Sequence, residues 1–567
     1  MAADEKKDRI AELLETLYGC RSREVYKSVL TLVENWRLKS DKAVQKGWVS
    51  QRDVMLITYG DSVKAENELP LTTLKSFADK YLKDTITAIH ILPMYPYTSD
   101  DGFSVVDYYS INAELGTWED VERLAADYDM MYDAVVNHIS KSSAWFQGFL
   151  NCDGKYRDYF IEADPSEDYS KVVRPRTLPL LTCFDTKEGK KHVWTTFSDD
   201  QIDLNFKSPD LLLEILEVLL HYAYSGARFI RLDAIGFAWK EKDSTCMHLK
   251  ETHAVVKLMR AVLEMVFPGT ILITETNVPH EDNISYFGNG SDEAQLVYQF
   301  PLPPLVLFSF IIGNASKLSA WAKSLEETPL SEGTTYFNFL ASHDGIGVRP
   351  TEGILTKEER ELMLDTVVRH GGRISYKSNS DGTKAPYELN INYMDALTDP
   401  SSADDKKRAD KFLAAQSILL SVAGVPGIYI HSLLGSRNWY EGLEESGINR
   451  RINREKLNYD RLCKELEDRG NIRNMVFSGF SRLIRMRRQQ PAFSPDAAQE
   501  VLFLDERAFC FVRNNTAANE RLLVMVNVSE QEYDVHYNCT GIDVVNEEKI
   551  CGNGIHMLPY QTRWIKY

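Results

Sequence analysis

The chain has 567 residues, of which 44% are hydrophobic, and a formal net charge of −18. A chain of this size can bury a large core, either as about two to four domains or as one barrel that carries insertions. The acidic balance argues against nucleic acids and anionic membranes as partners, because both favour basic surfaces. It does not exclude an anionic substrate, since a few arginines can reverse the potential inside a cleft.

The cysteines and the apolar segments predict the compartment. None of the 8 cysteines forms a Cys-x-x-Cys pair, and a chain of this size does not need disulfides, so we expect reduced thiols. The N-terminal segment is charged and amphipathic and does not resemble a secretory signal. The most apolar later stretch, 418–435, is interrupted by glycines and a proline, which favours a buried strand over a membrane span. These features predict a cytoplasmic protein and leave self-association into a homo-oligomer open.

The order of the predicted elements indicates a barrel. Residues 1–49 have apolar side chains at helical spacing and are predicted to form two helices. From Val54 onward, short apolar runs alternate with amphipathic helical segments, a pattern typical of a parallel sheet. About eight such units over roughly 400 residues favour an α/β fold with a closed TIM (β/α)8 barrel. An open doubly wound sheet is also compatible with the pattern alone. The predicted helices include 74–83, 118–128, 209–224 and 252–266.

Two stretches without clear periodicity predict inserted subdomains, and the short alternating strands of the tail predict a C-terminal antiparallel β domain. The predicted division is an N-terminal helical extension at 1–49, a first part of the barrel at 50–138, an inserted subdomain after the third strand at 139–208, a middle part of the barrel at 209–345, a second insertion at 346–397, a last part of the barrel at 398–496 and the β domain at 497–567.

Charged and polar residues gather where the predicted strands end. In a parallel barrel these ends face the active site. A single aspartate at such a position is more often a helix N-cap than a catalyst. Several carboxylates in one cleft raise one another's pKa, however, and a fold keeps them mainly where they do chemistry. The residues at these strand ends are Asp100, His138, Arg231, Asp233, Glu275, His343 and Asp344.

Three of the carboxylates suit glycosyl transfer with retention of configuration. This reaction needs one carboxylate that attacks the anomeric carbon and a second, protonated one about 5–5.5 Å away. Asp233 and Glu275 lie on consecutive predicted strands, so they can approach each other in this way. Arg231 shares a strand face with Asp233 and can hold it ionised. Asp344 can bind sugar hydroxyls and favour a positively charged transition state.

The motifs at these positions resemble those of the α-amylase superfamily of glycoside hydrolases. They are Asp100-x-Gly-Phe103, Asp133-x-x-x-Asn137-His138, Arg231-x-Asp233, Glu275 and His343-Asp344. The segments ITYGDS, HILPMYP, RPRTLPLLT, WTTFSDDQIDLN and FNFLASHDGIGV are similar to the sucrose phosphorylase subgroup of that superfamily. The resemblance covers about residues 54–567, and residues 1–49 lie outside the short sucrose phosphorylases.

The resemblance implies a role for each matching residue. Asp233 is expected to be the nucleophile, Glu275 the general acid/base and Asp344 the transition-state stabiliser. Phosphate, in place of water, is expected to resolve the glucosyl-enzyme at Arg176 and Tyr387. Arginine suits phosphate because its guanidinium can bind two oxygens, although a surface ion pair is the alternative for Arg176. No metal or organic cofactor is implied. The residues expected to bind the donor glucose are Asp100, Phe103, His138, Arg231, His343 and Arg450.

The acceptor side departs from plain sucrose phosphorylases, which carry a histidine two residues after the acid/base where this chain has Asn277. This difference, the segments 237–240 and 435–438, and the N-terminal extension look more like glucosylglycerate phosphorylases. Their reaction converts 2-O-α-D-glucosylglycerate and phosphate reversibly into α-D-glucose 1-phosphate and D-glycerate. Asn277, Arg437 and Lys377 are the candidates for binding the glycerate carboxylate, with a solvated loop position as the alternative for Lys377.

Other functions stay open on the sequence alone. Sucrose phosphorylase, sucrose 6′-phosphate phosphorylase and glucosylglycerol phosphorylase share the same motifs, and a retaining α-glucosidase-type hydrolase shares the carboxylates. A non-catalytic interaction protein with an amylase-like ectodomain is disfavoured, because the carboxylates are present and no anchoring segment is predicted.

Overall fold

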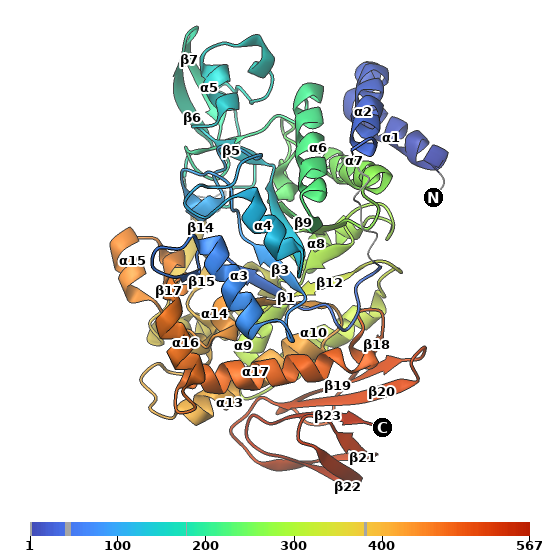
Figure 1. Ribbon diagram of the computed structural model, residues 1–567, viewed down its shortest axis with the longest axis vertical. Helices are drawn as coiled ribbons and strands as arrows, with labels where there is room; N and C mark the ends of the chain where they lie inside the picture. Colours follow the sequence, from blue (N-terminus) through green and yellow to red (C-terminus); the bar gives the residue numbers. More distant parts are fainter. Residues whose placement is uncertain (1–2, 40–46, 177, 379–382) are drawn as a thin grey trace.

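The computed structural model describes residues 3–39, 47–176, 178–378 and 383–567 (Figure 1). At its centre is a closed barrel of parallel strands in the order β1-β16-β12-β11-β10-β9-β4-β3, which confirms the predicted TIM barrel and excludes the open sheet. The barrel strands are β1 (Met55–Thr58), β3 (Ala88–Ile91), β4 (Asp129–Val135), β9 (Ala227–Asp233), β10 (Ile271–Thr274), β11 (Leu296–Tyr298), β12 (Thr335–Asn338) and β16 (Val425–Tyr429).

The barrel strands are short apolar runs that are buried on both faces, because side chains fill the barrel interior and helices cover its outside. Helix starts follow local signals: Ser208 caps α6 through the Leu211 amide, and Pro209 is the first residue of that helix. The major helices around the barrel are α3 (Pro70–Tyr81), α4 (Trp118–Ala125), α6 (Pro209–Tyr224), α7 (Lys250–Val266), α9 (Leu302–Ile312), α10 (Ser316–Ser324), α13 (Asp405–Ser421), α16 (Tyr459–Glu467) and α17 (Ile472–Arg488).

Three of the four predicted helices have other bounds in the structure, among them 252–266, which begins at Lys250. The helix predicted at 74–83 begins at Pro70, because a proline is well accommodated in the first turn although it is not part of the apolar repeat. The helix predicted at 118–128 ends at Ala125. The apolar stretch 418–435 contains the end of α13 and the strand β16, separated at Gly424, whose φ of 135° favours glycine.

A helical hairpin at the N-terminus packs against the outside of the barrel (Figure 1). It consists of α1 (Ala3–Tyr18) and α2 (Ser22–Arg37) and contacts α6 and α7, the helices next to β9 and β10. Tyr18 donates a hydrogen bond to the Phe206 carbonyl at 2.9 Å. The hairpin therefore supports the side of the barrel from which Asp233 and Glu275 project. Residues 40–46, which the sequence also assigned to this extension, lie outside the described residues.

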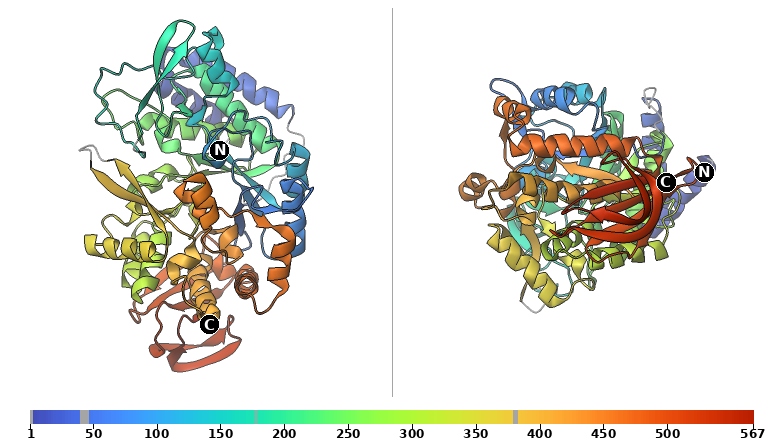
Figure 2. Two further views of the ribbon diagram at one scale, coloured as in Figure 1. Left: turned by 90° about the vertical axis from the view of Figure 1, so that its left-hand side faces the viewer. Right: turned by 90° about the horizontal axis from the view of Figure 1, so that it is seen from below.

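Two groups of elements lie over the carboxyl end of the barrel (Figure 2, left). The first follows β4 and contains β5 (His138–Ser140), α5 (Ala144–Leu150), β6 (Leu181–Thr186), β7 (Gly189–Trp194) and β8 (Gln201–Asp203). The second follows β12 and contains β13 (Ile346–Gly347), α11 (Lys357–Arg369), β14 (Arg373–Ser378), β15 (Lys384–Asn390) and α12 (Tyr393–Leu397). Its three strands form a sheet in the order β13-β15-β14. The two groups together form the walls above the barrel mouth.

The tail forms the predicted antiparallel sheet. This sheet lies next to α17, at the end of the molecule away from β6 and β7 (Figure 1 and Figure 2, right). The ring of Phe493 contacts Trp564 at 4.8 Å between centroids. The buried Arg487 donates to the Leu420 carbonyl at 2.7 Å and the Gly424 carbonyl at 3.2 Å, and so ties α17 to the start of β16. The strands are β18 (Ala498–Leu502), β19 (Ala508–Asn515), β20 (Glu520–Asn527), β21 (Tyr533–Asp543), β22 (Glu548–Met557) and β23 (Thr562–Lys566).

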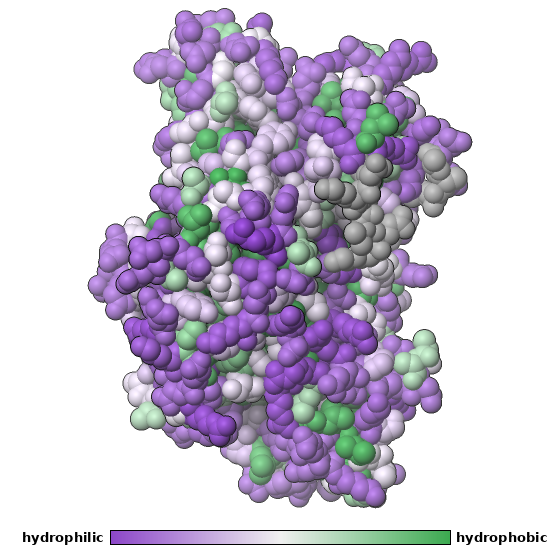
Figure 3. Space-filling model, viewed as in Figure 1, coloured by the Kyte–Doolittle hydropathy of each residue, from purple (hydrophilic) through white to green (hydrophobic). Residues whose placement is uncertain are grey.

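The surface agrees with the acidic, polar composition. The face shown in Figure 3 is mostly hydrophilic and carries only small, separate hydrophobic groups. Within the described ranges, no helix combines the length and hydrophobicity needed to cross a membrane.

We expect Leu14→Ala to destabilise the protein, because Leu14 is fully buried where α1 packs on the rest of the core. Leucine-to-alanine changes in cores cost about 2–5 kcal/mol through lost burial and a cavity. Thermal unfolding measures the loss, and Glu12→Ala, at an exposed position of the same helix, is the control. Equal melting temperatures for the two variants would show that α1 is not packed on the core.

Candidate active site

The carboxyl ends of the barrel strands and the segments above them enclose a cavity that we call the inner cavity. Asp233 is the last residue of β9, Glu275 follows β10 directly, and Asp344 follows β12. Most residues that the sequence singled out line this inner cavity: Asp100, Phe103, His138, Arg176, Asp233, Glu275, Asn277, His343, Asp344, Tyr387 and Arg450. Residues up to 350 positions apart in the chain thus converge as the strand-end argument expects; their individual roles stay predictions.

Arg231 organises the floor of the inner cavity. Its side chain is buried, and one guanidinium nitrogen bonds both Asp133 and Asp233, the latter at 2.8 Å. The other nitrogen lies 3.8 Å from the Glu275 carboxylate. Asp133 is bound from its far side by His90 at 2.6 Å. One cation therefore fixes the positions of the two carboxylates on which the predicted chemistry depends.

The environment favours different protonation states for Asp233 and Glu275. Burial raises the pKa of Glu275 to about 8; Arg231 opposes this shift, whereas Asp233 and Asp344 reinforce it. Burial also raises the pKa of Asp233, but Arg231 and then His138 oppose the rise. Because Arg231 is closer to Asp233 than to Glu275, its charge stabilises an ionised Asp233 more strongly. At neutral pH Glu275 therefore carries a proton beside an ionised aspartate.

Asp344 has the opposite environment. Burial opposes its ionisation, but the charges of Arg450, His343 and Arg454 outweigh that effect and lower its pKa. Arg450 contacts Asp344 at 2.6 Å and is held in turn by Glu388 at 2.6 Å. Glu388 is buried on β15 and was not singled out from the sequence, because only the fold brings it next to Arg450. Asp344 is thus a fixed negative charge in the cavity wall.

The apolar side of the inner cavity is built around Phe103. Its ring stacks on His343 with centroids 4.7 Å apart and planes 4° apart. Its carbonyl accepts hydrogen bonds from His138 at 2.9 Å and from Gln201 at 3.1 Å. Gln201, on β8, is a second residue that sequence reasoning missed, although it stands within the motif WTTFSDDQIDLN. A flat apolar surface rimmed by hydrogen-bonding groups suits a sugar ring.

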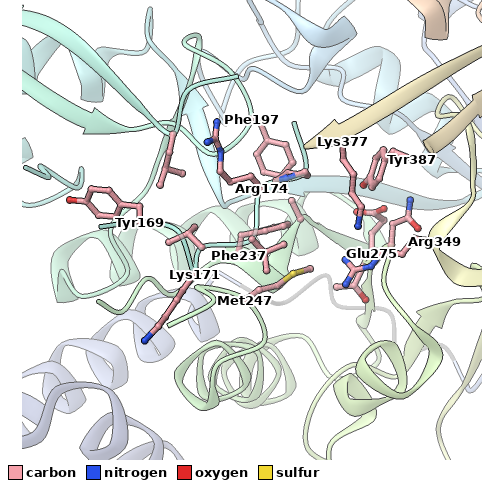
Figure 4. A pocket seen from close by; sticks show the side chains of 18 of the residues that line it. Tyr169, Lys171, Arg174, Phe197, Phe237, Met247, Glu275, Arg349, Lys377 and Tyr387 are labelled. Carbon is pink, nitrogen blue, oxygen red and sulfur yellow. The ribbon is translucent and has the colours of Figure 1, made fainter. Parts of the chain in front are cut away.

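A larger outer cavity of about 780 Å³ continues from Glu275 toward the solvent (Figure 4). Tyr387 lines both cavities. It is the extra residue of a β-bulge, because Ser375 pairs with Glu388 and Tyr376 with Pro386. Bulges commonly turn a side chain toward an active site. Figure 4 shows Lys377, Tyr387 and Arg349 grouped beside Glu275 on one wall. The opposite wall comes from 169–175.

Arg437, which was predicted to bind an acceptor carboxylate, lies away from the inner and the outer cavity. Its guanidinium is bound to Asp395 and to the Pro400 carbonyl at 3.1 Å. The reason is that Asp395 is a buried carboxylate on α12 and needs a cationic partner. Lys377 and Asn277 do line the outer cavity.

The closed barrel and the carboxylates at its mouth define an enzyme of the class that acts on glycosidic bonds. A model of the alpha amylase catalytic domain matches residues 35–370. The chain belongs to this α-amylase family.

Individual relatives show which members of this family the chain is similar to. The chain is 48% identical to a glucosylglycerate phosphorylase from Spirochaeta thermophila, over 93% of this chain and 90% of that one. It is 44% identical to a glucosylglycerate phosphorylase from Escherichia coli, over 99% of this chain and 100% of that one. The crystal structure of a sucrose 6F-phosphate phosphorylase from Thermoanaerobacter thermosaccharolyticum superposes with a TM-score of 0.74 at 25% identity, over 91% of this chain and 100% of that one.

We expect Glu275→Gln to stabilise the protein at alkaline pH. Folding raises the pKa of Glu275 from 4.5 to about 8, so the folded state holds this proton more tightly than the unfolded state. The stability that comes from the protonated group is therefore complete below 4.5 and is lost as the pH rises through 8. Glutamine does not titrate, so the variant should gain a few kcal/mol relative to the wild type between about pH 5 and pH 9.

Melting temperatures across this range measure the effect. Glu281→Gln, which neutralises an exposed glutamate at the start of α8 (His280–Ile284), is the control and should not change with pH relative to the wild type. A constant difference between Glu275→Gln and the wild type would show that Glu275 is already ionised at neutral pH.

Proposed function

We propose that the protein is a retaining glycoside phosphorylase that converts 2-O-α-D-glucosylglycerate and phosphate reversibly into α-D-glucose 1-phosphate and D-glycerate. The observation that carries the proposal is the pairing of an arginine-bound Asp233 with a protonated Glu275 at one cavity. The relatives named glucosylglycerate phosphorylases, at 44% and 48% identity over nearly the whole chain, support the choice of substrate.

In the first step Asp233 attacks the anomeric carbon of the bound glucoside. The bond from that carbon to the glycerate oxygen breaks, and Glu275 gives its proton to the departing oxygen. The product is a β-glucosyl ester of Asp233 and free D-glycerate. Arg231 orients Asp233 for the attack, and its charge keeps the attacking carboxylate ionised.

In the second step a phosphate oxygen attacks the anomeric carbon from the face that D-glycerate left, opposite to the ester bond. The ester bond to Asp233 breaks, the ionised Glu275 takes up the proton of the attacking phosphate, and α-D-glucose 1-phosphate is released. Two inversions give net retention. Arg176 and Tyr387, which line the inner cavity, are proposed to hold the phosphate. Arg176 lies 3.8 Å from Asp100, which leaves its guanidinium close to the sugar position.

The donor glucose is proposed to lie against Phe103, with its hydroxyls bound by the polar groups around that ring. Asp344 is proposed to stabilise the positive charge that develops at the anomeric carbon, because its own negative charge is fixed by Arg450. The other proposed glucose ligands are Asp100, His138, Arg231, His343 and Arg450. These steps use side chains and phosphate alone.

The acceptor carboxylate is proposed to bind in the outer cavity, near Asn277 and Lys377. Cationic side chains in that cavity favour an anionic acceptor over neutral fructose or glycerol. The same observation keeps sucrose 6′-phosphate as a second candidate substrate, because its fructosyl group is also anionic. All 8 cysteines are free thiols, which supports the proposal that the enzyme works in the cytoplasm.

A panel of acceptors tests the assignment. With α-D-glucose 1-phosphate as donor, phosphate release should be fastest with D-glycerate, because that acceptor combines a small size with a carboxylate. Fructose, fructose 6-phosphate and glycerol are the comparisons, and a reaction without acceptor measures hydrolysis. Preference for fructose or fructose 6-phosphate would overturn the acceptor assignment, and an equal rate without acceptor would make the protein a hydrolase.

The two carboxylates should respond differently to substitution. Asp233→Ala should reduce turnover by at least about 10⁴-fold with every donor, because no ester can form. Glu275→Gln should lose about 10²–10⁴-fold with glucosylglycerate but much less with α-D-glucosyl fluoride, whose leaving group needs no proton. Initial rates with both donors provide the measurement. Near-normal turnover of Asp233→Ala would refute the nucleophile assignment.

A further inference from the structure

Two cationic side chains in the outer cavity form no ion pair with any residue that the structure describes. Within the described part of the chain, neither the Arg349 guanidinium nor the Lys377 amine takes part in an ion pair or a hydrogen bond. The Nε atom of Arg349 is buried without a partner. A guanidinium that is partly buried and unpaired is costly unless an anion binds it. The pair therefore indicates an anion site.

The local fold holds the two cations next to each other. Arg349 follows β13 after Val348, and Lys377 lies near the end of β14 in the same three-stranded sheet. The Val348 amide donates to the Tyr387 carbonyl at 3.0 Å and so fixes the segment that carries Arg349. Burial and then the charge of Arg349 lower the pKa of Lys377, and Glu352 opposes this effect. The two cations thus repel each other, and a shared anion would offset this repulsion.

The anion site lies where the proposed reaction requires a carboxylate. In a 2-hydroxy acid the carboxylate carbon is bonded to the carbon that bears the reacting oxygen, so it must lie within a few bonds of the Glu275 proton. Arg349, Lys377, Asn277 and Glu275 all line the outer cavity. Asn277 has a buried side-chain oxygen without a partner, and a Cβ on Gly347 would lie only 2.9 Å from that oxygen. The wall beside Asn277 is therefore closely fitted.

The other cationic side chains around the outer cavity either have a partner or point away from Glu275. Arg174 donates to the Leu178 carbonyl, and Lys171 is exposed at the rim, where Figure 4 shows its amine directed away from Glu275. Arg176 lines the inner cavity beside Asp100. Arg437 is bound to Asp395 outside both cavities. Arg349 and Lys377 are left as the cations with free donors near the reacting oxygen.

We propose that Arg349 and Lys377 together bind the carboxylate of a small 2-hydroxy acid acceptor. Arg349 contributes a planar fork that matches two carboxylate oxygens, and Lys377 adds a compact charge. The inference rests on the proposed function for the identity of the acceptor, but the anion site itself does not depend on catalysis. It assigns acceptor selectivity to the second insertion, with phosphate bound separately at Arg176 and Tyr387.

Binding of D-glycerate and of inorganic phosphate, measured by calorimetric titration, tests the proposal without any turnover. Arg349→Met and Lys377→Met should each weaken D-glycerate binding by about 10- to 100-fold, the loss expected for a charged hydrogen bond. Lys171→Met removes one charge from the rim of the same cavity and should change binding less than about threefold. Arg349→Lys should be intermediate, because it keeps the charge but not the fork.

Melting temperatures separate recognition from a structural role. Because neither cation loses an ion pair or hydrogen bond with the described residues, Arg349→Met and Lys377→Met should melt at or above the wild-type temperature. Unchanged glycerate affinity in both variants would overturn the inference, as would equal losses in Lys171→Met. Weaker phosphate binding with unchanged glycerate binding would also overturn it and would make the pair a phosphate site.

Kinetics distinguish this inference from the proposed function. Arsenate can replace phosphate in decomposing the glucosyl-enzyme, so arsenate-dependent release of glucose from α-D-glucose 1-phosphate reports the glucosyl-enzyme steps alone. Both variants should keep this activity within about threefold, whereas the KM for D-glycerate should rise by about 10- to 100-fold. If the wild type lacked arsenolysis but bound glycerate through this pair, the proposed function would fail and the anion site would stand.

Discussion

The guanidinium of Arg231 is the interaction on which the rest of the site depends. At the floor of the inner cavity it contacts Asp133 and Asp233, and it lies 3.8 Å from the Glu275 carboxylate. Without a cation at this point, three acidic groups in a buried space would repel one another, and burial would protonate them. With Arg231 in place, the negative charge stays on the carboxylates closest to its guanidinium, and the proton stays on Glu275. The proposed division of labour between an attacking carboxylate and a proton donor therefore depends on one side chain.

The barrel supplies the rigidity that this arrangement needs. Arg231 and Asp233 are alternate residues of β9, so they share a face, and Glu275 follows the adjacent strand β10. Asp133 on β4 contacts the same guanidinium nitrogen as Asp233, and His90 on β3 holds Asp133 in place. The N-terminal hairpin packs on α6 and α7, the helices that precede β9 and β10. Arg231, Asp233 and Glu275 are thus placed on strands or directly after one, while the segments above the barrel line much of the inner and the outer cavity.

Much of the barrel and of the inner cavity was predictable, because the sequence patterns that indicate them are local. Arg231-x-Asp233 needs only the two-residue period of a strand, and Glu275 is found at the end of an apolar run. Arg349, Glu388 and Gln201 were not found, because their importance arises from neighbours that are distant in the chain. The ion pair of Arg437 was not foreseen for the same reason: its partner Asp395 lies 42 positions away, and no sequence pattern connects them.

The central claim, a covalent bond between Asp233 and the anomeric carbon, can be observed directly. Glu275→Gln treated with α-D-glucosyl fluoride in the absence of phosphate should accumulate the glucosyl ester, since the fluoride leaves without a proton and the second step lacks its base and its nucleophile. Mass spectrometry of the digested protein should then place one added glucosyl group on the peptide that contains Asp233. An unmodified peptide at this position, or a glucosyl group on another carboxylate such as Asp344, would contradict the account.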